Sequence, residues 1–99
     1  MDTVGQLRVT RTRASRLSQV DFDNIPFGRV FSDHMLVADY LDSDWESPEI
    51  VPFQALTVSP CTTALHYGQS IFEGMKAYRN VRGRPVLLRL KDNFARMNR

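Results

Sequence analysis

The sequence has a single cysteine, no long apolar run and little net charge, and each shortage excludes a class of protein. Cys61 cannot form a disulfide within the chain, which favours a reducing compartment. No run of about 18 apolar residues exists, so the sequence predicts no membrane-spanning helix, and its start lacks the apolar core of a secretory signal. The net charge of +2 is too small to indicate a nucleic-acid-binding protein. We therefore expect neither a nucleic acid nor a membrane among its partners.

The length of 99 residues allows one domain at most, since a domain commonly has about 100–200 residues. Hydrophobic residues make up 42% of the chain and charged residues 24%, which excludes a disordered or collagen-like protein. A chain this short buries only about 60–65% of the surface that its unfolded form exposes. We therefore do not expect it to enclose a large active site by itself.

Residues 1–24 are expected to form an N-terminal tail or edge segment. The first twenty residues contain one acid and four arginines: Asp2, Arg8, Arg11, Arg13 and Arg16. An arginine-containing, acid-poor start can also be an organelle transit peptide. The apolar residues Val4, Leu7 and Val9 begin no clear stripe of helical period, which favours the tail over the transit peptide.

Short strands are predicted in the first half of the chain. The run Phe27–Tyr40 (FGRVFSDHMLVADY) is rich in β-branched and large apolar residues, which is typical of a strand covered on both faces. Residues 41–48 (LDSDWESP) have the composition of a turn. A further strand is expected over residues 49–58, with an interruption at Pro52.

A β-hairpin is predicted in the second half. The apolar runs 71–79 (IFEGMKAYR) and 85–90 (PVLLRL) are separated by a short linker that contains Gly83. Two such runs joined by a short glycine-containing linker are typical of a hairpin.

A helix is predicted to follow the hairpin. Leu90, Phe94 and Met97 recur at i, i+4 and i+7, which places them on one apolar stripe, and Asp92 near the start complements the helix dipole. We expect this helix to reach the end of the chain without a residue that terminates it. That pattern favours a chain that is a fragment of a longer protein.

The common catalytic constellations are absent from the sequence. His34 and His66 lie far apart and one cysteine adds no spacing to them, so no metal site is predicted. No strained Gly-x-Ser-x-Gly elbow occurs. We interpret His66 as a hydrogen-bonded structural side chain, which is the commoner role of a lone histidine beside an apolar residue.

The run 64–79 (ALHYGQSIFEGMKAYR) is unusual because glycines stand beside aromatic and charged residues. Glycine inside a strand often marks the close approach of a ligand or of another backbone. Phe72, two residues before Gly74, would point to the same strand face, and an aromatic wall beside a gap would form an apolar pocket. From the residues alone, a hairpin with a bulge at Gly74 and Phe72 in the core is favoured over that pocket.

Arg96 also has two interpretations. On the predicted helix it shares a face with Asp92 and Arg99, and geometry alone favours an exposed ion pair with Asp92. The alternative is an anion site, because a guanidinium binds phosphate bidentately.

The chain from Phe27 to Arg99 resembles the N-terminal part of branched-chain amino acid aminotransferases, which are fold-type IV pyridoxal-phosphate enzymes. Four blocks carry the resemblance in the family's order: FGRVFSDHMLVADY, the Ile50-Val51-Pro52 stretch, ALHYGQSIFEGMKAYR and NFARMNR. The resemblance implies an α/β (α+β) fold, in which residues 25–99 are an incomplete N-terminal small domain. The domain with the cofactor-binding lysine would lie beyond this chain, so we expect an N-terminal fragment of a longer enzyme.

The resemblance also implies roles for five residues. Arg96, the arginine of the N-x-x-R-M motif, would contact the phosphate of pyridoxal 5'-phosphate. Phe72 and Gly74 would line the pocket for the substrate side chain, and Tyr67 would line the pocket of the partner subunit across a homodimer. Phe27 would lie near the substrate.

No catalytic residue is expected within these 99 residues. Lys76 and Lys91 are the only lysines, and neither stands in the family's Schiff-base motif. No metal is expected either.

The resemblance implies an enzyme that moves the amino group of leucine, isoleucine or valine to 2-oxoglutarate, giving a branched 2-oxo acid and glutamate. The absence of a convincing targeting segment favours a cytoplasmic location. Two alternatives lie in the same fold, a D-amino acid aminotransferase and an aminodeoxychorismate lyase. A third alternative is a small non-enzymatic interaction module, which is favoured only if the reading frame ends at Arg99.

Overall fold

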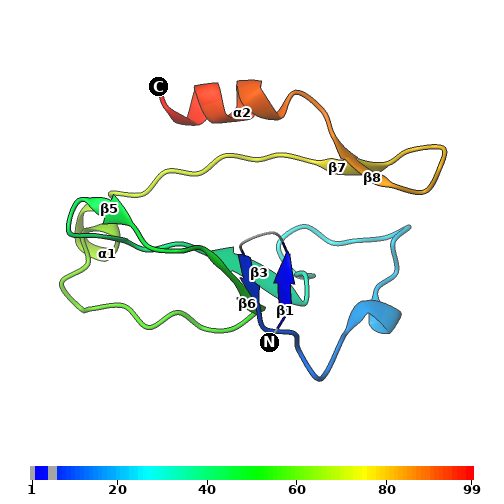
Figure 1. Cartoon of the computed structure of the whole chain (residues 1–99), viewed down its shortest axis with the longest axis horizontal. Helices are drawn as coiled ribbons and strands as arrows, with labels where there is room; N and C mark the ends of the chain where they lie inside the picture. The colour runs from blue at the N-terminus through cyan, green and yellow to red at the C-terminus, as the bar shows by residue number, and fades with distance from the viewer. Residues whose placement is uncertain (1, 5–6) are drawn as a thin grey trace. The chain divides into compact units, whose positions relative to one another are not determined.

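The computed structural model describes residues 2–4 and 7–99, with side chains from Leu7 onward. The chain divides into two compact units, Met1–Leu56 and Thr57–Arg99 (Figure 1). The first unit contains a β-sheet and the second a hairpin with two helices. The predicted mixture of helix and strand is thus present, and the expected boundary at residue 24 falls inside the first unit.

Four short strands form the sheet of the first unit, in the order β1-β2-β6-β3. Their bounds are Asp2–Val4 (β1), Leu7–Val9 (β2), His34–Val37 (β3) and Glu49–Pro52 (β6). β2 pairs parallel to β6, whereas β1 with β2 and β3 with β6 are antiparallel. Ile50 lies between Val9 and Leu36 in the register. Among residues 7–99, only Val9, at 5% exposure, is a buried apolar side chain.

The strand expected over Phe27–Tyr40 is shorter and less covered than predicted. Only β3 is extended and paired, and its Leu36 is 59% exposed, so the strand is not covered on both faces. The preceding residues form a loop because their polar groups bond to the N-terminal segment, as described below. The strand expected over residues 49–58 also ends early, at Pro52, since a proline cannot donate to the ladder.

The turn predicted for residues 41–48 contains a minimal hairpin. Its two strands are Tyr40–Leu41 (β4) and Asp44–Trp45 (β5). Asp42 and Ser43 both have positive φ, 50° and 67°, which is the backbone that matches the twist of a two-residue hairpin. The rings of Tyr40 and Trp45 meet edge to face with centroids 5.2 Å apart.

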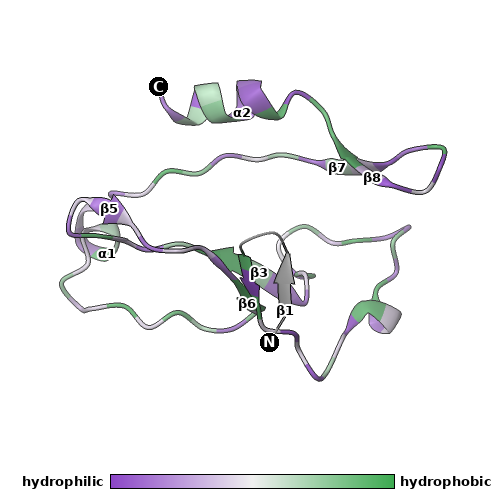
Figure 2. Cartoon of the chain, in the orientation of Figure 1, coloured by the Kyte–Doolittle hydropathy of each residue, from purple (hydrophilic) through white to green (hydrophobic). Residues whose placement is uncertain are grey.

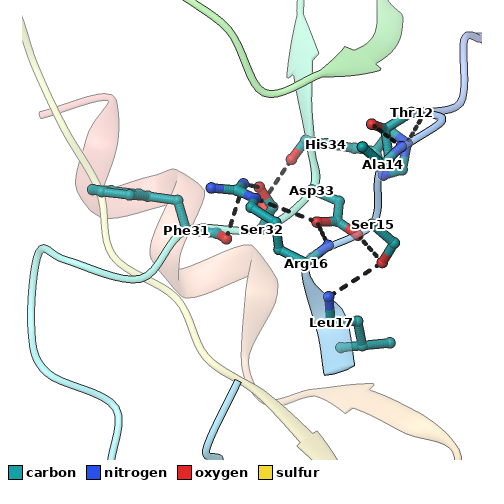
Figure 3. Close-up of polar contacts among 9 residues, drawn as sticks. All are labelled: Thr12, Ala14, Ser15, Arg16, Leu17, Phe31, Ser32, Asp33 and His34. Carbon is teal, nitrogen blue, oxygen red and sulfur yellow. Dashed lines mark hydrogen bonds and ion pairs between the residues drawn. The ribbon is translucent and has the colours of Figure 1, made fainter. Parts of the chain in front are cut away.

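Polar contacts attach residues 12–17 to residues 31–34 in the first unit (Figure 3). The Asp33 carboxylate accepts hydrogen bonds from the Ser15 hydroxyl at 2.5 Å and from the Arg16 backbone N–H at 2.9 Å. The Arg16 guanidinium donates to the carbonyl oxygen of Ser32 at 2.9 Å, and the Thr12 N–H donates to Nε2 of His34 at 3.0 Å. His34 therefore acts as a structural acceptor. A single 3-10 turn, Leu17–Gln19, follows this cluster.

The second unit confirms the predicted hairpin. Its strands are Ala77–Arg79 (β7) and Pro85–Leu87 (β8), paired antiparallel. The turn is held by Asn80, whose side-chain oxygen accepts from the backbone N–H groups of residues 82 and 84 at 2.9 and 3.0 Å. Gly83 supplies the positive φ of 75° that closes the turn. The strands are shorter than predicted, so residues 71–76 precede the hairpin as extended chain.

The predicted C-terminal helix is also confirmed, as α2 (Leu90–Met97) with Asp92 in its first turn. The expectation that nothing terminates this helix is wrong, because Asn98 is its C-cap and leaves the helical conformation, with φ −88° and ψ 4°. A second helix, α1 (Thr63–Tyr67), was not predicted. Its short length gives little periodicity, and it ends where Gly68 adopts a left-handed conformation with φ 61°.

Apolar side chains of the second unit remain largely exposed. Figure 2 shows a hydrophilic first turn of α2 and hydrophobic residues in the link that joins β8 to it. Leu88 in that link is 73% exposed, and Phe94 on the α2 stripe is 49% exposed. These side chains are available to pack against further protein.

Candidate functional site

Two of the motifs singled out in the sequence meet in the second unit, around Arg96. The Arg96 Nε donates to Oε2 of Glu73 at 2.9 Å, and its Nη2 donates to Oε1 of the same carboxylate. The Asn93 side-chain amide donates to Oε1 of Glu73 at 3.0 Å and to the Gly74 carbonyl oxygen at 2.9 Å. The segment that contains Glu73 and Gly74 is thereby bound to one face of α2.

The sequence dictates which side chains of α2 make these contacts. Asn93 and Arg96 are three residues apart on the helix, so their side chains project from the same face. A planar guanidinium offers parallel donors that match the two oxygens of a carboxylate, whereas the amide of Asn93 reaches only one of them. Glu73 is consequently held from two successive helix turns.

The predicted ion pair between Asp92 and Arg96 is wrong. Asp92 instead accepts from Nε of Arg89 at 2.5 Å. Arg89 stands at the start of α2 in a left-handed conformation with φ 56°, beside the first helix turn. Arg96 pairs with Glu73 because that carboxylate accepts both its Nε and its Nη2 donors, which is a stronger arrangement than a single exposed contact.

The pair is electrostatically well matched. Hydrogen bonds from Arg96, and then from Asn93, lower the pKa of the Glu73 carboxyl from 4.5 to about 2. The same carboxylate raises the pKa of Arg96. Glu73 is therefore ionised throughout the physiological range. Its side chain is 6% exposed, whereas the Arg96 side chain is 65% exposed.

Acid should weaken this pair within a defined pH range. A carboxyl whose pKa is lower in the folded protein stabilises the fold fully above its ordinary pKa, and this stabilisation is lost as the pH falls toward the folded value. For Glu73 the range runs from 4.5 down to about 2. We expect the difference in unfolding free energy between wild type and Glu73→Gln to shrink across this range, as measured by chemical denaturation at several pH values. A difference that stays constant would contradict the pairing.

Arg96 also lines a hollow of about 410 Å³. Its lining includes three arginines and one acid, together with an amide: Arg89, Arg96, Arg99, Asp92 and Asn93. Glu73 occupies two of the five guanidinium N–H groups of Arg96. The remaining donors can serve an anion, and the excess of cations around the hollow favours one.

The other predicted site residues lie on the surface. Tyr67 ends α1 and is 79% exposed, and Phe72 in the extended segment is 94% exposed. Phe27 belongs to the first unit and is fully exposed. A Cβ added at Gly74 would meet no atom within 4 Å. Within the second unit, the contacts around Arg96 thus include Gly74 but not Tyr67 or Phe72.

The hairpin-bulge interpretation of Gly74 is wrong in this structure. Gly74 precedes β7, so the hairpin ladder begins after it. Phe72 likewise does not lie in a core, given its exposure. The pocket interpretation of these two residues stays a prediction.

Sequence reasoning missed Glu73 and Asn93. One signal could have found Glu73, because it is the only acidic residue between Glu49 and Asp92, in a stretch that holds several arginines and lysines. Asn93 could have been found from its position on the Arg96 face of the predicted helix.

Across residues 2–4 and 7–99, no group of three or more potential metal ligands comes together. Within the same residues, the helices are all too short or too polar to cross a membrane.

The chain is similar to curated branched-chain aminotransferases, although no family model matches it. It is 41% identical over 93 residues to the branched-chain-amino-acid aminotransferase 2 of Bacillus subtilis (strain 168), covering 93% of the chain and 25% of the relative. It is 44% identical over 80 residues to the branched-chain-amino-acid transaminase 1 of the same organism, covering 80% of the chain and 22% of the relative. The cytosolic branched-chain-amino-acid aminotransferase of Saccharomyces cerevisiae is 43% identical over 74 residues, covering 74% of the chain and 20% of the relative. The chain spans a fifth to a quarter of the length of these relatives.

Proposed function

We propose, because the chain belongs to the branched-chain aminotransferase family, that the whole protein transfers the amino group of leucine, isoleucine or valine to 2-oxoglutarate. The observation that carries the proposal is sequence identity of 41–45% to relatives that bear this name. The contact between Glu73 and Arg96 supports it, since it joins two of the blocks on which the resemblance rests.

The proposed cofactor is pyridoxal 5'-phosphate, which withdraws electrons from the carbon that carries the amino group when it is bound. Arg96 is the residue of this chain that would hold its phosphate. The donor set fits that group, because the guanidinium retains free N–H donors on a mostly exposed side chain, which lines a hollow with two further arginines. Fixing the phosphate there would orient the rest of the cofactor relative to the protein.

Phe72 and Gly74 are proposed to shape the pocket for the branched side chain. Gly74 offers open space beside its Cα, and Phe72, two residues earlier in the chain, presents an exposed apolar ring. Such a pocket would exclude water from the reacting carbon and would discriminate side chains by their apolar volume, at about 1–3 kcal/mol per methylene.

Tyr67 and Phe27 are proposed to act in pockets that further protein completes. We propose that Tyr67 contributes to the pocket of the partner subunit in a homodimer, and that Phe27 lies near the substrate. Their high exposure supports this, because an aromatic side chain that serves a neighbouring surface is left uncovered in its own unit.

The lysine that binds the cofactor is proposed to lie outside these 99 residues. Lys76 and Lys91, the two lysines present, do not match the family's lysine motif. We also propose a cytoplasmic location, which the name of the yeast relative supports.

An assay of the whole protein tests the proposed activity. Purified protein with pyridoxal 5'-phosphate is given 2-oxoglutarate and, in separate reactions, leucine, isoleucine, valine or D-alanine, and glutamate is measured. We expect glutamate from the three branched amino acids and little from D-alanine. The result that would overturn the proposal is turnover of D-alanine alone, release of 4-aminobenzoate from aminodeoxychorismate, or no turnover of any substrate.

A further inference from the structure

We propose that Glu73 is a positioning residue for Arg96: its carboxylate holds the Nε–Nη2 edge of the guanidinium and directs the opposite end toward the phosphate of the cofactor. This inference rests on the proposed role of Arg96. It assigns Glu73 a function through Arg96, with no contact of its own to the cofactor.

The division of donors within the guanidinium supports this role. Glu73 takes one N–H from Nε and one from Nη2. Arginine carries five N–H groups in a rigid plane, so three remain, on Nη1 and on the outer side of Nη2. Two of these three are parallel and match two phosphate oxygens. The carboxylate and an anion can therefore occupy different edges of the same side chain.

The exposures of the two partners show which one fixes the other. The Glu73 side chain is 6% exposed, and Asn93 holds one of its oxygens at 3.0 Å. The Arg96 side chain is 65% exposed, so α2 alone would leave its long stem free to change rotamer. A carboxylate held in place thus restrains an exposed cation. Restraint before binding lowers the entropy cost of binding an anion.

The negative charge of Glu73 has the opposite effect, because it repels the phosphate. This effect on phosphate binding is smaller than that of positioning Arg96. Removing a carboxylate would by itself favour a phosphate nearby, since two negative charges repel. The guanidinium would stand between the carboxylate and the phosphate, so the repulsion acts over a longer distance than the contacts that each of them makes with Arg96. We therefore expect lost positioning to outweigh lost repulsion, so that neutralising Glu73 weakens phosphate binding.

The test compares a ligand that has the phosphate with one that lacks it, in the whole protein freed of cofactor. Dissociation constants for pyridoxal 5'-phosphate and for pyridoxal are measured by titration at fixed ionic strength. Glu73→Gln should weaken the binding of pyridoxal 5'-phosphate about 5- to 20-fold, which corresponds to losing the restraint of one long side chain. It should leave pyridoxal binding unchanged, whereas a merely structural defect would weaken both.

Asp92→Asn is the matched control variant. It removes one negative charge from the lining of the hollow beside Arg96, but Asp92 pairs with Arg89 and not with Arg96. We expect it to leave the affinity for pyridoxal 5'-phosphate equal or slightly higher. Should Glu73→Gln fail to fold, Glu73→Asp serves instead, because it keeps the charge and shortens the arm. It should again weaken the binding of pyridoxal 5'-phosphate and leave the binding of pyridoxal unchanged.

The pattern of results separates this inference from the role of Arg96 itself. If Arg96→Ala leaves the affinity for pyridoxal 5'-phosphate unchanged, the proposed role of Arg96 fails. If Arg96→Ala weakens that affinity while Glu73→Gln and Glu73→Asp leave it unchanged or raise it, the positioning role alone is overturned. If both proposed roles are correct, adding Glu73→Gln to Arg96→Ala should cause no further loss of affinity for pyridoxal 5'-phosphate, since the effect of Glu73 passes through Arg96.

Discussion

Replacing Arg96 by alanine is expected to weaken binding of pyridoxal 5'-phosphate to the whole protein by about 10- to 150-fold. The affinity falls because charge-assisted hydrogen bonds to the phosphate disappear. The Glu73 carboxylate, ionised and 6% exposed, is also left without the cation that balances it, which lowers the stability of the fold in the free and bound protein alike.

Arg96→Lys separates charge from geometry in the same experiment. Lysine restores a point charge without the planar fork, so it should recover only part of the affinity. The measurement is a cofactor titration of the apoprotein at fixed ionic strength, accompanied by a thermal unfolding curve for each variant. If the dissociation constant of the alanine variant for the cofactor lies within about twofold of the wild-type value, the proposed phosphate contact of Arg96 is wrong.

Replacing Gly74 by valine is expected to reduce kcat/KM for leucine by roughly 5- to 150-fold, with an unchanged melting temperature. An added Cβ at Gly74 would meet nothing within 4 Å in this chain, and its φ is not in the left-handed region. The substitution therefore costs the folded chain little. Filling a pocket typically costs about 1–3 kcal/mol, and here that cost would fall on the complex with substrate.

A graded control sharpens the prediction for Gly74. Gly74→Ala adds one methyl group and should cause a smaller loss than valine, in proportion to the volume that it occupies. Smaller substrates should suffer less than leucine with both variants. Equal rates for leucine in wild type, Gly74→Ala and Gly74→Val would instead show that Gly74 lies outside the substrate pocket.

The elements that sequence reasoning predicted correctly are those with local signals. The hairpin of β7 and β8 follows from a linker whose Asn80 and Gly83 are suited to a turn, and α2 follows from an apolar stripe at helical spacing. Helix α1 lacks such a signal, because five residues complete little more than one turn. Strand lengths were overestimated where apolar residues continue beyond the paired ladder, as at Phe27–Tyr40 and residues 71–76.

The site shows the same division between local and distant signals. Arg96 was singled out because it lies in a recognisable motif and on a definable helix face. Its actual partner, Glu73, is 23 residues away in the sequence, and no periodic pattern links the two. Asp92 was favoured because it is a close neighbour on the helix, but Arg89 is nearer to it in space. Pairing between charges that are distant in the sequence depends on the tertiary fold, which residue spacing alone does not predict.

The amide of Asn93 has a thermodynamic consequence, because one group bonds both to the Glu73 carboxylate and to the Gly74 carbonyl oxygen. Movement of the backbone at Gly74 therefore shifts the carboxylate that holds Arg96. If a substrate side chain displaces Gly74, its binding and that of the phosphate become coupled. Such coupling is reciprocal: the factor by which substrate changes cofactor affinity equals the factor by which cofactor changes substrate affinity. Removal of that single amide, as in Asn93→Ala, would weaken the coupling and leave only the peptide bond between residues 73 and 74 to transmit it.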